Sequence, residues 1–314
     1  MNAYQKTAIT TLVAVIILIT VGSLVRVAGA GLGCPDWPLC WGCWLPPSSV
    51  DDLDMAYIAE KGFDLAEFNP TKMWIEYINR MVGVAIGFLV FATFLRSIRY
   101  RATQAVIFRC SLLSVLLVGF QGWLGGQVVQ SGLVPGIITL HMVLALVLVG
   151  LLIFTTHEAT KTDVDITLSE GVRGPFTRIA MALLVLTFAQ LILGTQVREA
   201  VDPFIKDPGG LARSEWLANA GMVDHIHRAS SWLVLVAGVF LFRFMRLNSI
   251  AGLLRRLGYW ILMGIMGQMI LGIILAYGGL PKSAQVLHLV IATFLICTQF
   301  YVILLTRDRT QHAT

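Results

Sequence analysis

Eight long apolar stretches dominate this 314-residue chain and restrict the folds open to it. They run over roughly 7–28, 73–95, 106–129, 136–157, 174–197, 224–246, 255–277 and 283–305. Each is long enough to cross the hydrocarbon core of a bilayer, which takes about 20 mainly apolar residues. Hydrophobic residues make up 57% of the chain and charged residues 13%, a balance that a soluble domain could not bury. The sequence therefore predicts an all-α integral membrane protein with eight transmembrane helices.

The short connections between these stretches indicate an orientation. Arginines gather in the connections after the second and sixth stretches and in the segment after the eighth, namely Arg96, Arg99, Arg101, Arg243, Arg246, Arg255, Arg256, Arg307 and Arg309. Cytoplasmic loops carry such an excess of positive charge. The long connection 29–72 is instead acidic, which suits the outer side. We expect a multi-pass protein of the cell membrane with both termini cytoplasmic, and the net charge of +5 reflects this bias rather than nucleic-acid binding.

The chain also contains an internal repeat, whose landmarks recur in the same order. These are Gly22-Ser-Leu-Val-Arg26 with Gly194-Thr-Gln-Val-Arg198, Glu76-Tyr-Ile-Asn-Arg80 with Asp224-His-Ile-His-Arg228, Gln121-Gly-Trp-Leu-Gly125 with Gln268-Met-Ile-Leu-Gly272, Pro135 with Pro281, and His141 with His288. Each half has an even number of spans, so both halves enter the membrane from the same side as parallel repeats. We expect two four-helix bundles, residues 1–157 and 174–314, joined by a cytoplasmic linker over 158–173.

Histidines near the outer ends of alternate helices are the candidate metal ligands. His227 and His288 in the second half, and His141 in the first, lie one to two turns into their stretches and so at a similar depth, near the outer face. Neutral imidazole is a standard axial ligand of haem iron, and histidines inside a membrane are rare. We predict a haem held by His227 and His288 and a second haem site at His141. A hydrogen bond to a neighbouring helix is the alternative role for each.

The two halves differ at the fourth of these positions, which is Asn79. Asparagine is a poor haem ligand, so an iron beside it is either five-coordinate or part of a haem that comes and goes as a substrate. A haem held by two histidines has no open iron position and suits electron transfer. The difference predicts a division of labour in which one half passes electrons and the other does chemistry.

Glu76 is the candidate catalytic residue. Its spacing places it on one helical face with Asn79 and Gly83. A carboxyl in such a place can move protons or stabilise a cation, and a glycine lets a macrocycle approach the backbone. The alternative role for Glu76 is an ion pair with Arg80, four residues along the helix.

Four arginines near the outer helix ends run against the charge bias: Arg26, Arg80, Arg198 and Arg228. A guanidinium pairs well with a carboxylate, so haem propionates are the partners that we predict. Carboxylates of the protein and lipid phosphates are the alternative partners.

Three cysteines, Cys34, Cys40 and Cys43, cluster in the connection 29–72. An outer loop faces an oxidising compartment, which favours a disulfide. We favour Cys34–Cys40, with Cys43 as the odd residue or the alternative partner. A zinc site is disfavoured because no histidine lies nearby.

The segment from Gly31 to Cys40, the motif from Glu76 to Gly83 and the repeat with its three histidines together resemble haem A synthases over essentially the whole chain. The resemblance implies an oxidoreductase that converts the C8 methyl group of haem O to a formyl group through hydroxylated intermediates. It also implies an outer cysteine pair at Cys34 and Cys40, and an essential carboxylate at Glu76.

The same resemblance implies a cofactor haem b at His227 and His288 and the substrate haem O at His141. Asn79 departs from the pattern, because many family members have a second histidine there. The departure leaves room for oxygen or water at that iron. The connection 198–223 carries no cysteine, whereas some members have a second pair there.

The expected partners are haem O, membrane lipid and an electron donor that the sequence does not identify. Haem O synthase, terminal oxidase assembly factors and a second copy of the chain are further candidates. Two other functions are open at this point. A di-haem b-type electron carrier without haem-modifying activity would favour two similar bis-histidine sites. A transporter would favour a polar site at the membrane midplane, whereas the polar residues here gather near one face.

Overall fold

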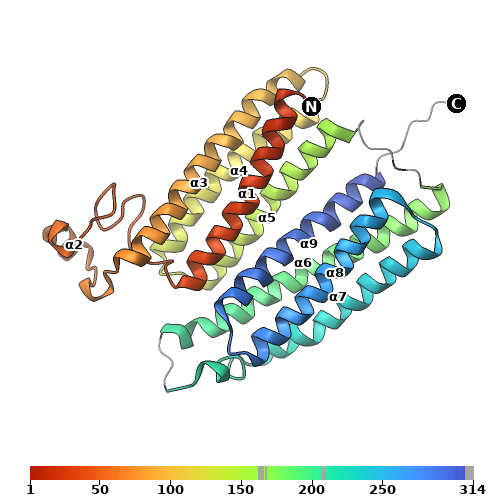
Figure 1. Cartoon of the computed structure of the whole chain (residues 1–314). Coiled ribbons are helices and arrows are strands. Elements are labelled where there is room, and N and C mark those ends of the chain that lie inside the picture. Colours follow the sequence, from red (N-terminus) through yellow and green to blue (C-terminus); the bar gives the residue numbers. More distant parts are fainter. Residues whose placement is uncertain (162–165, 167, 207–209, 308–314) are drawn as a thin grey trace. The chain divides into compact units, whose positions relative to one another are not determined.

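The computed structural model describes residues 1–161, 166, 168–206 and 210–307. Within them the regular elements are helices, apart from one isolated bridge in a loop (Figure 1). Eight are long and apolar enough to span a membrane: α1 (Ala3–Ala28), α3 (Pro70–Ser97), α4 (Ala105–Gln130), α5 (Pro135–Thr160), α6 (Glu170–Lys206), α7 (Met222–Leu247), α8 (Gly252–Tyr277) and α9 (Lys282–Arg307). The predicted all-helical architecture with eight spans is confirmed. Arg309, and residues 162–165 and 167 of the expected linker, lie outside the described residues.

The contacts divide the chain into two compact units, Met1–Thr156 and His157–Thr314. Each unit contains four of the long helices. The division falls close to the expected end of the first half. The expected linker 158–173 is nevertheless partly helical, because α5 continues to Thr160 and α6 begins at Glu170.

In the first unit, polar side chains join α1 to the antiparallel helix α3. Asn2 caps α1, and its side-chain amide donates to the Tyr100 hydroxyl just beyond the end of α3 at 2.8 Å. Deeper in the pair, the hydroxyls of Thr11 and Thr93 share a hydrogen bond of 2.8 Å. Such pairs suit a bilayer, where an unpaired polar group finds no water.

The second unit is a closed four-helix bundle. Helix α6 packs against α7 and α9, and α8 packs against the same two helices. The amide of Gln299 on α9 donates to the Thr187 hydroxyl on α6 at 3.1 Å. The apolar part of the bundle core includes the buried side chains of Phe176, Leu183, Leu241, Met245, Leu254, Ile261, Ile265 and Val302.

The same rare turn precedes the last helix of each unit. Gly132 and Leu133 before α5 have φ angles of 69° and 66°, and Gly279 and Leu280 before α9 have 68° and 55°. The left-handed region costs a residue with a side chain about 1–2 kcal/mol. Because both leucines adopt it at equivalent places, the repeat seen in the sequence extends to backbone geometry.

Two elements differ from the sequence expectation. Helix α6 runs to Lys206, through Pro203, well beyond the predicted end near 197. The connection 29–72 contains a short helix, α2 (Met55–Lys61), that the apolar pattern did not predict. Its ends carry ordinary signals, because Asp54 caps the first turn and Gly62 ends the helix at a φ of 67°.

Candidate functional site

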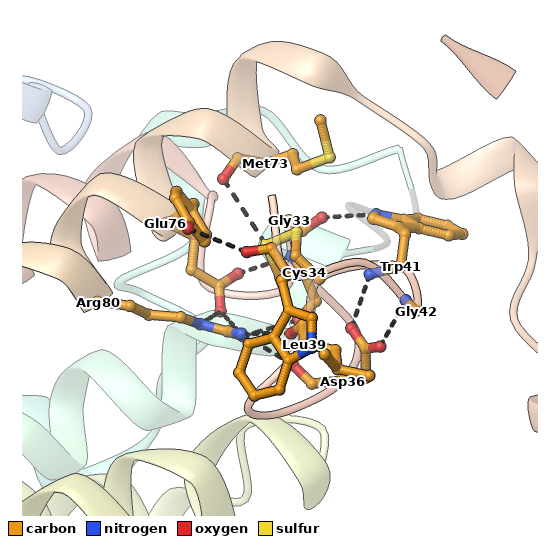
Figure 2. The surroundings of a disulfide bond; sticks show 12 residues. Gly33, Cys34, Asp36, Leu39, Trp41, Gly42, Met73, Glu76 and Arg80 are labelled. Atoms are coloured by element: carbon orange, nitrogen blue, oxygen red, sulfur yellow. Dashed lines mark hydrogen bonds and ion pairs between the residues drawn. A yellow bond between two sulfur atoms is a disulfide. The ribbon is translucent and has the colours of Figure 1, made fainter. Parts of the chain in front are cut away.

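A disulfide organises the loop between α1 and α3. Cys34 and Cys40 are joined, as predicted (Figure 2). Cys43 is a free thiol. Cys40 and Cys43 also exchange two backbone hydrogen bonds, of 2.9 and 3.1 Å, that close a tight hairpin. The loop is therefore held by one covalent bond and one short turn.

The carboxylate of Asp36 fixes the hairpin turn from inside. It accepts the backbone N–H groups of Trp41 and Gly42, both at 2.7 Å, and the Tyr57 hydroxyl at 3.2 Å. The Trp41 indole donates to the Gly33 carbonyl at 2.8 Å. Burial raises the pKa of the Tyr57 phenol, and the negative charge of Asp36 raises it further.

Glu76 and Arg80 dock this loop onto α3. The Glu76 side chain is buried, with the residue 3% exposed, and accepts the Cys34 backbone N–H at 2.9 Å and Arg80 Nη2 at 2.5 Å. Arg80 donates to three loop carbonyls, those of Cys34, Asp36 and Leu39, at 2.8 to 3.1 Å (Figure 2). The ion pair considered as the alternative role of Glu76 is thus present. The propionate role of Arg80 stays a prediction, and its guanidinium is already occupied by the loop.

The loop reaches two helices through glycines. A Cβ atom at Gly33 would lie 2.5 Å from the carbonyl carbon and oxygen of Lys72, at the start of α3. On α4, a Cβ atom at Gly126 would lie 2.8 Å from the Trp37 ring. Trp37 therefore covers α4 one residue beyond Gly125, which faces a histidine.

Each of the three candidate histidines is approached by a Gln-x-x-x-Gly sequence on the preceding helix. The glutamine amides donate to histidine carbonyl oxygens at 2.9, 2.6 and 2.6 Å, in the pairs Gln121–His141, Gln190–His227 and Gln268–His288. One turn later a glycine faces the ring of the same histidine. A Cβ atom there would lie 3.6, 3.1 and 4.0 Å from Cε1, at Gly125, Gly194 and Gly272 respectively.

The ring nitrogens distinguish the three histidines. Nδ1 of His141 and of His288 is buried and has no hydrogen-bond partner among the described residues. Nδ1 of His227 lies 3.1 Å from the Gln190 amide nitrogen. The alternative role, a ring hydrogen bond to a neighbouring helix, is therefore absent at Nδ1 for the first two. Asn79 also carries a buried oxygen without a partner in the described part of the chain.

These residues fit a haem better than a bare metal ion. No group of three His, Cys, Asp or Glu side chains that could hold an ion is found in the residues that the structure describes. Haem iron is held largely by its macrocycle and takes only one or two imidazoles from the protein. Gly83 lies one turn after Asn79 on α3, and Gly22 lies on the neighbouring helix α1. Both glycines face open space, since a Cβ atom at either would meet nothing within 4 Å.

Of the other three candidate arginines, Arg26 and Arg228 lie near helix ends, and Arg198 lies about two turns before the end of α6. Arg228 pairs with buried Asp224 on α7, and 40% of the Arg228 side chain is exposed. Arg198 Nε lies 3.3 Å from Asp202 Oδ1 on α6, and Arg26 lies in the last turn of α1. Propionate pairing stays a prediction for all of them.

The sequence interpretation missed three residues that shape the site. It gave no role to Gln190, to Ser230, whose hydroxyl donates to Gln190 Oε1 at 2.7 Å, or to Gly33. The third Gln-x-x-x-Gly sequence, from Gln190 to Gly194, was a usable signal. No sequence signal indicated the contact at Gly33, because a close approach between two backbones leaves no pattern of side chains.

The fold and the site define a multi-span membrane protein with intramembrane histidines presented from four-helix units. The chain belongs to the family described as cytochrome oxidase assembly protein, whose model matches residues 5–300.

Several relatives of this chain are proteins named Heme A synthase. The one from Shewanella oneidensis is 27% identical over 214 residues, which cover 68% of this chain and 62% of the relative. The one from Dinoroseobacter shibae is 27% identical over 321 residues, 90% of this chain and 82% of the relative. The one from Bradyrhizobium diazoefficiens is 27% identical over 311 residues, 88% and 84%. The chain thus spans less than two thirds of the first relative and most of the other two.

Gly33→Ala should loosen the outer loop. The added methyl meets the α3 backbone, which cannot move aside as a side chain can, and such overpacking costs about 1–3 kcal/mol. We expect a lower thermal unfolding midpoint in detergent and faster proteolysis within 34–68. Gly31→Ala is the matched control, because its Cβ would make only ordinary contact with the Leu133 side chain at 3.5 Å. Equal effects of the two substitutions would contradict the proposed docking contact.

Proposed function

We propose that this protein is a haem A synthase, a membrane oxidoreductase that converts the C8 methyl group of haem O to a formyl group. The match of the family model over residues 5–300 carries the proposal. The inequivalence of the two halves supports it, because Asn79 stands where the second half has His227. A pure electron carrier would have no use for that difference.

His227 and His288 are the residues that would hold a cofactor haem b, and His141 would hold the substrate haem O. Their support is the shared environment: each histidine lies opposite a glycine, within two turns of the start of its helix. Arg26 and Arg228 lie near helix ends and Arg198 about two turns before the end of α6, and each is a candidate partner for a propionate. The electron donor, haem O synthase, other assembly factors and a second copy of the chain remain candidate partners.

A bound haem supplies the oxidising chemistry at a methyl carbon that side chains cannot provide. The protein would position the haem, cover the site at His141 and provide a side chain that takes or holds a proton. Trp37 covers α4 beside the glycine that faces His141. The Glu76 carboxylate uses three acceptor positions, for Cys34 N–H and for Nε and Nη2 of Arg80. We assign the proton-handling role to this buried carboxylate, because a positioned carboxyl is a usual general acid or base.

The orientation is also part of the proposal. We place both termini in the cytoplasm and the connection 29–72, with the haem sites, at the outer side of the cell membrane. The disulfide between Cys34 and Cys40 supports this placement, because disulfides persist in oxidising compartments. The arginine-rich connection that follows α3 supports the opposite side as cytoplasmic.

The proposed activity is tested by haem extraction. We expect that co-expression with a haem O synthase, in a host that makes no haem A, yields haem A or its hydroxymethyl precursor, identified by mass. The same host without this chain is the control. A folded, haem-loaded protein that yields only haem B and haem O would contradict the proposal and favour the di-haem electron carrier.

Glu76→Gln should reduce haem A formation by about 10²-fold or more, the usual contribution of a positioned acid or base. The matched control is Asp224→Asn, which removes the equivalent carboxylate from the ion pair with Arg228 in the other half. Thiol titration of Cys43 reports whether the loop is still docked. If Glu76→Gln forms haem A at the normal rate, Glu76 has no catalytic role.

Gly194→Ala should lower the haem b content of the purified protein. The methyl would lie 3.1 Å from His227 Cε1, so the ring must shift. Changes around a metal ligand typically cost 10–100-fold in affinity. Gly272→Ala is the control, because its Cβ would lie 4.0 Å from His288 Cε1. The pyridine haemochrome assay measures both, and equal haem contents would argue against His227 as a ligand.

A further inference from the structure

The surroundings of His227 form a closed hydrogen-bond network that the other histidines lack. The Gln190 amide nitrogen lies 2.6 Å from the His227 carbonyl oxygen and 3.1 Å from Nδ1 of its ring. The Gln190 oxygen accepts the Ser230 hydroxyl at 2.7 Å, from one turn further along α7. One amide is thus fixed by a hydroxyl and in contact with both the backbone and the ring of a single histidine.

The equivalent places in the first unit are apolar. The repeat that pairs Asn79 with His227 pairs Val82 with Ser230, and the repeat that pairs Gly22 with Gly194 pairs Leu18 with Gln190. Helix α1 packs against α3 as α6 packs against α7, so the frame is the same in both units. The ligand, the amide and the hydroxyl are therefore all replaced together.

We propose that Gln190, fixed by Ser230, positions the His227 imidazole as a haem ligand, and that Leu18 makes the N-terminal half a one-histidine site. The inference rests on the haem sites of the proposed function. It adds a positioning residue, and it explains why the first half differs from the second at more than one position.

The chemistry of an amide suits this role. A histidine that binds iron through one ring nitrogen carries its proton on the other. Nδ1 of His227 then becomes a donor, and the Gln190 amide can present its oxygen instead of its nitrogen by turning over. The nitrogen of the turned amide can then donate to the Ser230 hydroxyl, which accepts as well as donates. The turned amide gives up its bond to the His227 carbonyl oxygen, so it must move away from that oxygen when it accepts Nδ1–H.

A purely structural glutamine would behave differently. Gln268 and Gln121 donate to the carbonyl oxygens of His288 and His141, yet Nδ1 of both histidines has no partner within the described residues. These two amides join helices without reaching the ring. Gln190 does both, so its effect on the ring can be measured separately from its effect on stability.

The first test measures the midpoint reduction potential of the haem in the purified full-length protein. Gln190→Leu removes the acceptor for Nδ1–H, which lowers the basicity of the imidazole and favours ferrous iron. We expect a positive shift of the potential, and a return toward the original value in Gln190→Glu, which keeps an acceptor oxygen. An unchanged potential in Gln190→Leu would overturn the positioning role.

Gln299→Leu is the matched control for this test. Gln299 is 1% exposed and also joins two helices of the same unit, through Thr187, but lies three turns from His288 along α9. Its loss should lower thermal stability without moving the potential. An equal shift in both variants would show that the potential follows general destabilisation, and the proposal would fail.

The second test is a gain of ligation in the first unit. Asn79→His should give only partial low-spin bis-imidazole signal by electron paramagnetic resonance at that site, while Asn79→His combined with Leu18→Gln should give at least twice as much. Equal signals would overturn the role of Leu18. If Gln190→Leu fails to fold, the comparison of these two Asn79→His variants still tests the proposal. If the unaltered protein purifies without any haem, it is the proposed haem sites that fail.

Discussion

A bilayer offers no hydrogen-bond partners, and the pairing of the polar side chains within the long helices follows from that constraint. Helices satisfy their own backbone groups, and an intramembrane hydroxyl bonds either a carbonyl one turn back, as Thr20 does at Ile16, or a group on a neighbouring helix. Thr11 with Thr93, and Gln299 with Thr187, are such ties. Each tie fixes the height of one helix against the next. The hydrogen bond from Gln121 to the His141 carbonyl oxygen is a tie of the same kind. Such bonds set the depth at which each imidazole lies in the membrane.

The same constraint explains how the outer loop and the helices form one structure in the first unit. Glu76 is buried at the start of α3 and needs both a counter-charge and donors. Arg80 supplies the charge, and the Cys34 N–H supplies a donor from the loop. Arg80 in turn satisfies three loop carbonyls that the tight disulfide turn leaves without partners. The carboxylate proposed to handle protons is therefore also the anchor of the loop that covers the site.

The parts of this structure that follow from side-chain pattern could be predicted, and those that depend on backbone contacts could not. Eight apolar stretches gave eight spans, and the spacing of Glu76 and Arg80 gave their ion pair. The close approach of Gly33 to α3 involves only backbone atoms and leaves no trace in the sequence. Helix α6 was predicted too short because its apolar stretch ends near 197, whereas the helix continues through charged residues and Pro203 to Lys206.

The proposal makes the differences between the halves at Asn79, Leu18 and Val82 one linked change rather than several independent ones. A glutamine at position 18 would have only a backbone carbonyl to bond, as Gln121 has at His141, and no imidazole to orient. Leucine at position 18 needs no polar partner, and without the amide a serine at position 82 would bond only the backbone of its own helix, as Ser230 also does at Ile226. Replacing a histidine by Asn79 therefore favours Leu18 and Val82 in its surroundings. Restoring the histidine alone would place a ring beside apolar neighbours, with nothing to orient it for iron.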